Sequence, residues 1–346
     1  MVLIYVVIAL LALWGLHIRK QVDATAGLSM EQSTMIKGIF VLLVFASHVS
    51  QYFTLPEGFL SWGYRFIRTN LGQMIVVPFL FFSGYGVRCS IMRKGDAYVR
   101  AMPRKRILHT YVHTAIILLM FLAVQLALGE LYSIKKLLLG FIFLESFGNS
   151  TWYLFAILFL YAATWLSFRM AHSAKGAIAL CFLFTAAYFI ALSLWKEAYW
   201  YDTVFAYPFG LVFPDLREQF ERMTARSSVR LAGFVLLCGA FLVLTMSHFS
   251  QPVYGILENV RAILFMLLIL VVLMRLHIGN PVLHWLGTHV FLCYMLQRLP
   301  MIVLDHFGVS LSSIPLFVLG SAVGTVFLVV IVDKLLKGLD RQVLHS

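Results

Sequence analysis

The chain has 346 residues, of which 61% are hydrophobic and only 12% are charged, and its mean hydropathy is +0.90. A soluble globular domain carries about 25% charged residues, so this chain has too few polar side chains to cover a surface in water. We therefore predict an all-α polytopic membrane protein whose solvent is the bilayer. Alternating strands of about ten residues are missing from the sequence pattern, which excludes a transmembrane β-barrel.

The net charge of +12 would suggest a nucleic-acid partner in a soluble protein, but here we expect the basic residues to set the orientation in the membrane. No nucleic acid is expected as a partner. The four cysteines form no CxxC pair, so we predict neither a metal site nor a disulfide framework. All four lie in or beside apolar runs, as small buried hydrophobic residues do: Cys89, Cys181, Cys238 and Cys293.

Eleven apolar runs are candidates for transmembrane helices, in chain order 1–18, 35–53, 72–91, 107–128, 152–169, 177–195, 202–213, 230–248, 257–276, 285–305 and 313–333. The first has no cleavage site and is interpreted as a retained helix. The run at 202–213 contains Pro and Gly, which favours a weaker, broken span. Residues 134–148 are too short and too charged for a confident span, so we expect a re-entrant or interfacial segment there.

The distribution of Lys and Arg supports this topology. With the amino terminus outside, the predicted inner loops hold eighteen Lys and Arg residues and the outer loops hold five. The positive-inside rule requires such a bias, so the carboxyl terminus is predicted to be cytoplasmic. The predicted organisation is an extra amino-terminal helix with its loop (1–34), a membrane domain (35–333) and a short cytoplasmic tail (334–346). No internal repeat of the kind found in many transporters is evident.

One predicted helix keeps two ionisable side chains in an apolar run. Lys37 and His48 are eleven residues apart, and eleven steps of about 100° bring a helix back to within roughly 20° of its starting direction. Both side chains therefore lie on one face, and His48 lies roughly 16 Å further along the axis. Lys37 and Arg88 lie near inner ends, where long side chains reach the headgroups.

Other polar residues fall in the outer half of the predicted spans. A central Arg298 costs roughly 2.5–3.5 kcal/mol on insertion scales, so we expect it to face a partner or a wet cavity. Arg261 follows Glu258 by three residues, and a local ion pair would explain it. Interhelical hydrogen bonds are the alternative explanation for each residue singly. Together the set suggests a polar cavity that opens outward with His48 near its floor: His48, Gln125, Glu145, Arg261, Gln297 and Arg298.

The predicted inner loop 92–106 is the densest basic stretch. A topology signal explains its charge completely. The functional alternative is an anion site, because Arg100 and Arg104 share one face if the stretch is helical, and Arg suits phosphate. The same spacing recurs at Arg222, Arg226 and Arg230, so spacing alone does not decide.

Several stretches together resemble the membrane acyltransferase-3 family. "KGIFVLLVFASH" (37–48) resembles its signature of a basic residue, ten residues and a histidine, and "FLFFSGYGV" (79–87) resembles its second core helix. Three further matches follow in family order: "VRAMPRKRILHTYV" (99–112), with the family's RxxxR stretch, "STWYLFAILFLY" (150–161) and "LGTHVFLCYMLQRLP" (286–300). The chain departs from the family at Gln297, where many members have histidine.

The resemblance implies ten core helices and a multi-pass location in the bacterial cytoplasmic membrane. It also implies transfer of an acyl group, usually acetyl, from cytoplasmic acyl-CoA to a hydroxyl of an extracytoplasmic glycan or lipid-linked saccharide. Acetyl-CoA would be the donor substrate, and no metal is expected. A transporter or flippase of a lipid-linked saccharide or small anionic solute is the alternative, but it gives no reason for the spacing of Lys37 and His48.

Roles follow for the candidate residues under this interpretation. His48 would act as a general base or carry the acyl group transiently, and Lys37 would assist it from the cytoplasmic side. Arg100 and Arg104 would bind the phosphates of CoA. Trp152, near the outer end of its span, would stack on a sugar, or else belong to the interfacial aromatic belt. Three more residues are candidates for the acceptor site: Glu145, Arg261 and Arg298.

Overall fold

The structure is a computed structural model that describes residues 2–54, 58–247 and 253–343. Within these ranges, eight helices are long and apolar enough to cross a membrane: Met30–Val49, Ser61–Lys94, Asp96–Ala127, Trp152–Met170, Ala174–Ser193, Ser227–Met246, Val253–Leu273 and Ile314–Arg341. A ninth span would be the bent pair Pro281–Thr288 and Val290–His306, whose axes differ by 73°. This architecture fits the predicted helical, multi-pass membrane protein, but the predicted count of eleven spans is not confirmed.

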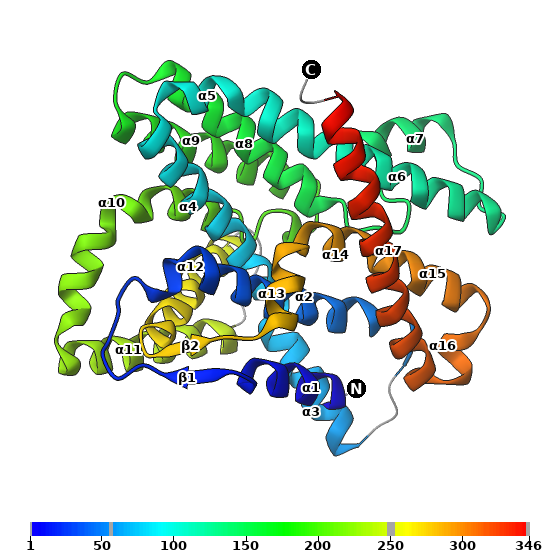
Figure 1. Cartoon of the computed structure of the whole chain (residues 1–346), viewed down its shortest axis with the longest axis horizontal. Coiled ribbons are helices and arrows are strands. Elements are labelled where there is room, and N and C mark those ends of the chain that lie inside the picture. Colours follow the sequence, from blue (N-terminus) through cyan, green and yellow to red (C-terminus); the bar gives the residue numbers. More distant parts are fainter. Residues whose placement is uncertain (1, 55–57, 248–252, 344–346) are drawn as a thin grey trace.

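Figure 1 shows the order of the elements and the central position of α2. The α-helices are α1 (Val2–Leu13), α2 (Met30–Val49), α3 (Phe59–Leu71), α4 (Val77–Lys94), α5 (Asp96–Met102), α6 (His109–Ala127), α7 (Ile134–Phe141), α8 (Trp152–Met170), α9 (Ala174–Ser193), α10 (Ala206–Ala225), α11 (Ser227–Met246), α12 (Val253–Leu273), α13 (Pro281–Thr288), α14 (Val290–Leu296), α15 (Arg298–His306), α16 (Val309–Ser312) and α17 (Ile314–Val343). The shorter elements are strands β1 (Leu16–Ile18) and β2 (Leu276–Ile278), 3₁₀ turns at Ala26–Leu28, Gly72–Val76 and Ala198–Trp200, and a π-helical segment, Pro103–Leu108.

The helix lengths decide the outcome for three predicted segments. Helix α1 has 12 residues, which at 1.5 Å per residue gives about 18 Å, whereas the hydrocarbon core is about 30 Å thick. The chain after it turns into β1, which pairs antiparallel with β2. Helix α7 has only eight residues, too few to cross, which agrees with a segment that does not span. The predicted tail 334–346 continues α17 as far as Val343, and residues 344–346 lie outside the described part.

Of the weak span predicted at 202–213, residues 206–213 form the first part of α10, a 20-residue helix with Pro214 inside it, and residues 202–205 form a turn before it. Its apolar half packs closely on α4. A Cβ added at Gly84 would meet the backbone carbonyl of Tyr207, and one added at Gly210 would meet the backbone carbonyl of Phe81, so both glycines allow the two helices to approach. Arg88 then lies buried and pairs with Asp215 of α10 at 2.9 Å, rather than extending to the headgroups.

Helix α2 begins where the side chain of Ser29 accepts a hydrogen bond from the backbone N–H of Gln32, a standard amino-terminal cap. It packs on α13 through a second pair of glycines. A Cβ at Gly38 would meet the backbone of Leu283, and one at Gly287 would meet the backbone of Thr34. This contact fixes the rotation of α2, and therefore the direction of the face that carries Lys37 and His48.

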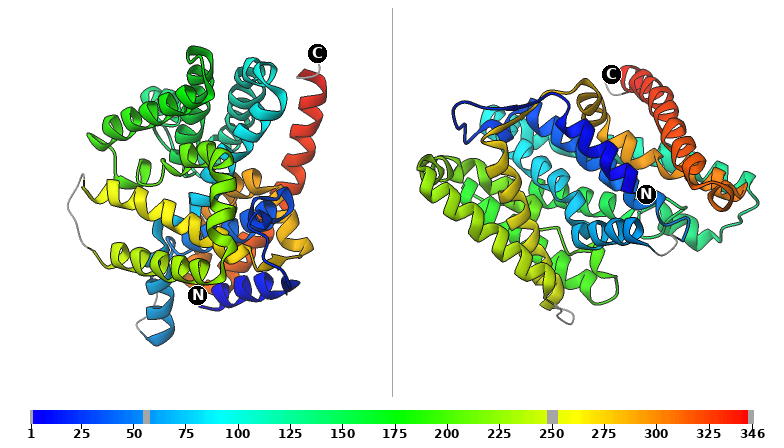
Figure 2. Two further views of the ribbon diagram at one scale, coloured as in Figure 1. Left: turned by 90° about the vertical axis from the view of Figure 1, so that its left-hand side faces the viewer. Right: turned by 90° about the horizontal axis from the view of Figure 1, so that it is seen from below.

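The single helix predicted at 285–305 is broken at His289, the residue between α13 and α14. After the bend, α14 and α15 pack against α17 (Figure 1). Figure 2 shows α11 and α12 as an antiparallel pair at the edge of the molecule. All twenty residues of α11 are described and none is buried, as expected for an apolar helix that faces lipid. The bend between α13 and α14 places Tyr294 of α14 in the interior, beside α2.

Candidate functional site

Lys37 and His48 lie on the same helix, but they line different cavities. The His48 cavity has a volume of about 620 Å³, and the Lys37 cavity has a volume of about 360 Å³. His48 is the second-last residue of α2, whereas Lys37 lies in its first half. The face predicted from the eleven-residue spacing therefore connects two separate spaces in the structure.

The His48 cavity is lined mainly by polar and aromatic side chains. Its walls come from α2, the Gly72–Val76 turn, the segments before α8 and α10, and α14 and α15. Three of the four predicted acceptor-site residues line it: Glu145, Trp152 and Arg298. The guanidinium of Arg298 lies 5.8 Å from the ring centre of Tyr52, and its buried Nε has no partner among the described residues. The expectation that Arg298 faces a cavity agrees with this position.

Arg261 does not line either cavity. It is buried, and its Nη2 lies 2.7 Å from an oxygen of Glu258, three residues earlier on α12. Its guanidinium also lies over the ring of Phe241 at 5.7 Å. The local ion pair considered from the sequence is therefore present. A role for Arg261 in binding a substrate remains a prediction, and Arg261 is not part of either cavity wall.

His48 presents one nitrogen to a hydroxyl. Its Nε2 lies 3.1 Å from the Oγ of Ser150, while its Nδ1 is buried and has no partner among the described residues. The side chain is only 9% exposed. Ser150 lines the same cavity, immediately before the turn that starts α8. Because a neutral imidazole can accept a proton from a hydroxyl at this distance, the geometry suits general-base chemistry.

An aromatic wall of the His48 cavity was not predicted from the sequence. Trp195, Tyr199 and Trp200 line the cavity together with Trp152, and the rings of Trp152 and Tyr199 lie 6.1 Å apart. Lys196 lies over the rings of Trp195 and Trp200, at 4.6 and 4.3 Å. The sequence carried the cluster "WKEAYW" at 195–200, but aromatic and charged residues are common at the end of a membrane helix, so the cluster alone did not distinguish a cavity wall from an interfacial belt.

The Lys37 cavity is formed by α2, α4, the π-helical segment, α6, α8 and α14. Besides Lys37, it is lined by Arg106, whose Nε donates to the hydroxyl of Tyr98 at 3.0 Å. Ser83 and Thr110 add hydroxyl groups, and His109 and His113 add imidazoles. The cavity thus has two basic side chains, Lys37 and Arg106, which favours an anionic ligand.

Arg100 and Arg104 lie outside this cavity, although on the same stretch of chain. The predicted loop 92–106 is mostly helical, with Arg100 in α5 and Arg104 in the π-helical segment. The Arg100 side chain is 68% exposed and pairs with Asp96 at 3.3 Å, and Arg104 is also exposed. Arg106, which sequence reasoning counted only as a topology signal, is the arginine of this stretch that lines the cavity.

Tyr294 connects the two spaces, because among the described residues it alone lines both the His48 and the Lys37 cavity. Its ring lies 6.2 Å from that of His48 and 5.3 Å from that of Tyr153, which belongs to the Lys37 cavity. Its hydroxyl donates to the backbone carbonyl of Ser150 at 3.4 Å. The side chain of Tyr294 therefore stands at the boundary between a cavity with cations and a cavity with a potential base.

Residues 32–334 match the family described as the acyltransferase domain (Acyl_transf_3). The chain belongs to this acyltransferase family. The match covers both cavities, from Lys37 and His48 to Tyr294 and Arg298, and it leaves α1 outside. Comparison with curated proteins and with solved structures finds no match.

Membership of the acyltransferase family supports acyltransferase activity, and the apolar helices fit a multi-pass membrane protein. The resemblance noted in the sequence is therefore confirmed at the level of the family. For this acyltransferase, the helix that carries the basic-residue-to-histidine signature is also the helix that joins the two cavities.

Proposed function

We propose that this acyltransferase moves an acyl group, in the first instance acetyl, from acyl-CoA bound at the Lys37 cavity to a hydroxyl of a saccharide bound in the His48 cavity. The observation that carries the proposal is the arrangement of the two cavities on one helix, with Tyr294 lining both. A donor and an acceptor can thus approach the same point from different directions. An O-acetyltransferase acting across a bilayer needs such an arrangement.

The Lys37 cavity is proposed to take the donor. Lys37 and Arg106 supply positive charge for the phosphates or the thioester arm of acyl-CoA, through charge-assisted hydrogen bonds. Arg100 and Arg104 lie on the adjoining exposed stretch and would hold phosphates outside the cavity. By the distribution of Lys and Arg, this end of α2 faces the cytoplasm, where acyl-CoA is available. The long, thin pantetheine arm would extend along α2 towards Tyr294.

The His48 cavity is proposed to take the acceptor, a glycan or lipid-linked saccharide on the outer side. Its aromatic wall suits the apolar faces of sugar rings, while Glu145 and Arg298 offer partners for hydroxyl or phosphate groups. Trp152 and Tyr199 lie close enough to form one stacking surface. The size of the cavity, about 620 Å³, is within the range of ligand sites for small molecules and leaves room for a sugar unit.

The proposed chemistry uses His48 as the base. Its Nε2 takes the proton of the acceptor hydroxyl while the hydroxyl oxygen attacks the thioester carbonyl carbon. A carbon–oxygen bond forms and the carbon–sulfur bond breaks, and the CoA thiolate leaves with the proton returned by the imidazolium. In the variant with a transient acyl group on His48, a carbon–nitrogen bond forms as the carbon–sulfur bond breaks, and the carbon–nitrogen bond breaks in turn when the acceptor oxygen attacks the acyl carbon. Arg298 lies in the same cavity wall and would favour the developing oxyanion.

The test is acyl transfer by the purified protein in lipid nanodiscs. With acetyl-CoA and a membrane glycan extract, we expect release of free CoA thiol and matching incorporation of labelled acetyl into the glycan fraction. Movement of a lipid-linked saccharide across vesicles without any CoA release would instead favour a transporter. Acyl transfer from a larger acyl-CoA but not from acetyl-CoA would keep the reaction class and change the donor.

A further inference from the structure

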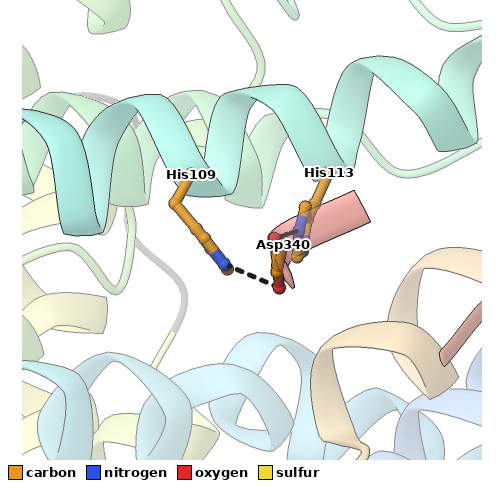
Figure 3. Close-up of side chains that lie close together, drawn as sticks. All are labelled: His109, His113 and Asp340. Atoms are coloured by element: carbon orange, nitrogen blue, oxygen red, sulfur yellow. Dashed lines mark hydrogen bonds and ion pairs between the residues drawn. The ribbon is translucent and has the colours of Figure 1, made fainter. Parts of the chain in front are cut away.

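Three potential metal ligands converge where the end of the last helix meets the start of α6 (Figure 3). His109 and His113 are four residues apart on α6, so both rings point from one helix face. Asp340 comes from α17, 227 residues after His113. From each group one ligand atom is available, and these atoms all lie within 4.8 Å of one another.

Each histidine contacts a different oxygen of the Asp340 carboxylate. The Nε2 of His113 lies 2.9 Å from one carboxylate oxygen of Asp340, and the Nε2 of His109 lies 3.3 Å from the other. The imidazole rings have their centres 4.0 Å apart. Both histidines thus direct Nε2 towards the same carboxylate.

We propose that His109, His113 and Asp340 bind a divalent transition-metal ion, of which Zn²⁺ is the representative. Two imidazole nitrogens and a carboxylate are a common donor set for zinc with an open fourth position. Imidazole favours Zn²⁺ over Mg²⁺ or Ca²⁺, which prefer oxygen ligands. Tetrahedral Zn–N and Zn–O bonds of about 2.0–2.2 Å place the donor atoms roughly 3.3 Å apart. The donors here already lie within 4.8 Å of one another, and rotation of His109, whose side chain is 36% exposed, would complete the arrangement.

The surroundings agree with a site that is accessible but partly protected. The His113 side chain is 10% exposed and that of Asp340 is 26% exposed, so the inner ligands are shielded while His109 offers a route in from solvent. Both histidines line the Lys37 cavity, so a fourth ligand would come from water in that cavity. Because the basic side chains of Lys37 and Arg106 repel a cation, electrostatic attraction to Asp340 alone would not hold a metal ion here. Binding would therefore depend on the imidazole donors.

A bound ion would also join two parts of the chain. Asp340 lies beyond residue 334, where the match to the acyltransferase family ends, whereas His109 and His113 lie within it. Coordination would hold the end of α17 on the start of α6, beside the wall of the Lys37 cavity. The sequence alone predicted no metal site, because the cysteines carry no metal pattern and the third ligand is remote from the histidine pair.

The experiment uses the full chain in detergent, purified without a histidine tag and stripped with a chelator. Zn²⁺ is titrated by calorimetry and the bound metal is counted by elemental analysis. We expect one equivalent bound to the wild type, and an affinity at least about tenfold weaker for His113→Ala and Asp340→Asn. The matched control is His289→Ala, because His289 faces a single carboxylate, that of Asp333 at 3.9 Å. It should bind zinc like the wild type.

Thermal unfolding gives a second measure of zinc binding and also shows whether each variant is folded. A Zn²⁺ concentration that saturates the wild type should raise the Tm of the wild type and of His289→Ala equally, and it should raise the Tm of His109→Ala, which loses the most exposed ligand, by a smaller amount. Failure of the folded wild type to bind one equivalent of zinc would overturn the proposal and leave an ion pair between helices. Equal loss of binding in His289→Ala and His113→Ala would overturn it as well. None of these readouts depends on acyl transfer.

Discussion

The Nε2 of His48 lies 3.1 Å from the Oγ of Ser150, inside the cavity proposed to take the acceptor hydroxyl. The pair shows that the nitrogen can engage a hydroxyl without movement of α2. In direct transfer, the acceptor hydroxyl takes over this contact, and the serine takes no part in the exchange of bonds. In a relay, the serine would itself be acylated.

Replacement of Ser150 separates these two pathways. For direct transfer, we expect Ser150→Ala to lower kcat by about tenfold or less, because one neutral hydrogen bond contributes about 0.5–1.5 kcal/mol. The measurement is steady-state transfer of labelled acetyl at saturating donor. A loss as large as that of His48→Ala, together with absence of a labelled acyl-enzyme in the variant, would contradict direct transfer and make Ser150 the carrier.

Lys37 should act on donor binding more than on the chemical step. A charge-assisted hydrogen bond contributes about 1.5–3 kcal/mol, so we expect Lys37→Ala to raise KM for acyl-CoA by about 10- to 100-fold with a smaller change in kcat. Lys37→Arg should recover most of the affinity. Lys105→Ala is the control, because Lys105 is exposed near the same end of α6 and lines neither cavity. An unchanged KM for Lys37→Ala would show that the donor binds elsewhere.

Tyr294 should keep the thioester from water until an acceptor is present. Its removal in Tyr294→Ala would join the two cavities, so we expect CoA release without acceptor to rise relative to productive transfer. Tyr294→Phe keeps the ring and loses only the hydrogen bond to the Ser150 carbonyl, and it should retain coupling. The assay compares thiol release with acetyl incorporation. Equal coupling in the wild type and Tyr294→Ala would exclude a role for this side chain as a barrier.

The contact between α4 and α10 provides a stability test with an internal control. Gly84→Ala would press a Cβ against the backbone carbonyl of Tyr207, and overpacking of this kind costs about 1–3 kcal/mol. Gly86→Ala, two residues along the same helix, meets nothing within 4 Å and should be neutral or stabilising by up to about 1 kcal/mol. Thermal unfolding in detergent measures both. Similar Tm values for the two variants would show that the helices do not pack as closely as described.

Some parts of this site were predictable from the sequence because they depend on one helix. The common face of Lys37 and His48 follows from helical periodicity alone, and the structure adds that this face opens to two cavities. The break at His289 was not predictable, since the apolar run continues through it without proline or glycine at that residue. The length of α1 was overestimated because hydropathy does not distinguish the helix from the strand that follows.

The remaining residues of the site come together only through tertiary packing. Ser150, Trp200 and Tyr294 belong to three separate segments, and no local pattern places them around His48. Likewise, the position of Arg106 rather than Arg100 in the cavity wall depends on how the π-helical segment packs against its neighbours. The charge count identified the basic stretch, but it carried no information on which side chain turns inward.

The most direct test of the central claim is transfer of labelled acetyl from acetyl-CoA to membrane glycans by His48→Ala, at matched expression. His172→Ala, which removes an exposed histidine from the turn between α8 and α9, is the control. We predict that transfer is lost in His48→Ala, by a factor of about 10² or more, while His172→Ala retains wild-type transfer and both variants retain their Tm. Wild-type transfer by a folded His48→Ala would contradict the account, because His48 would then be a packing residue and the proposed reaction would have no base.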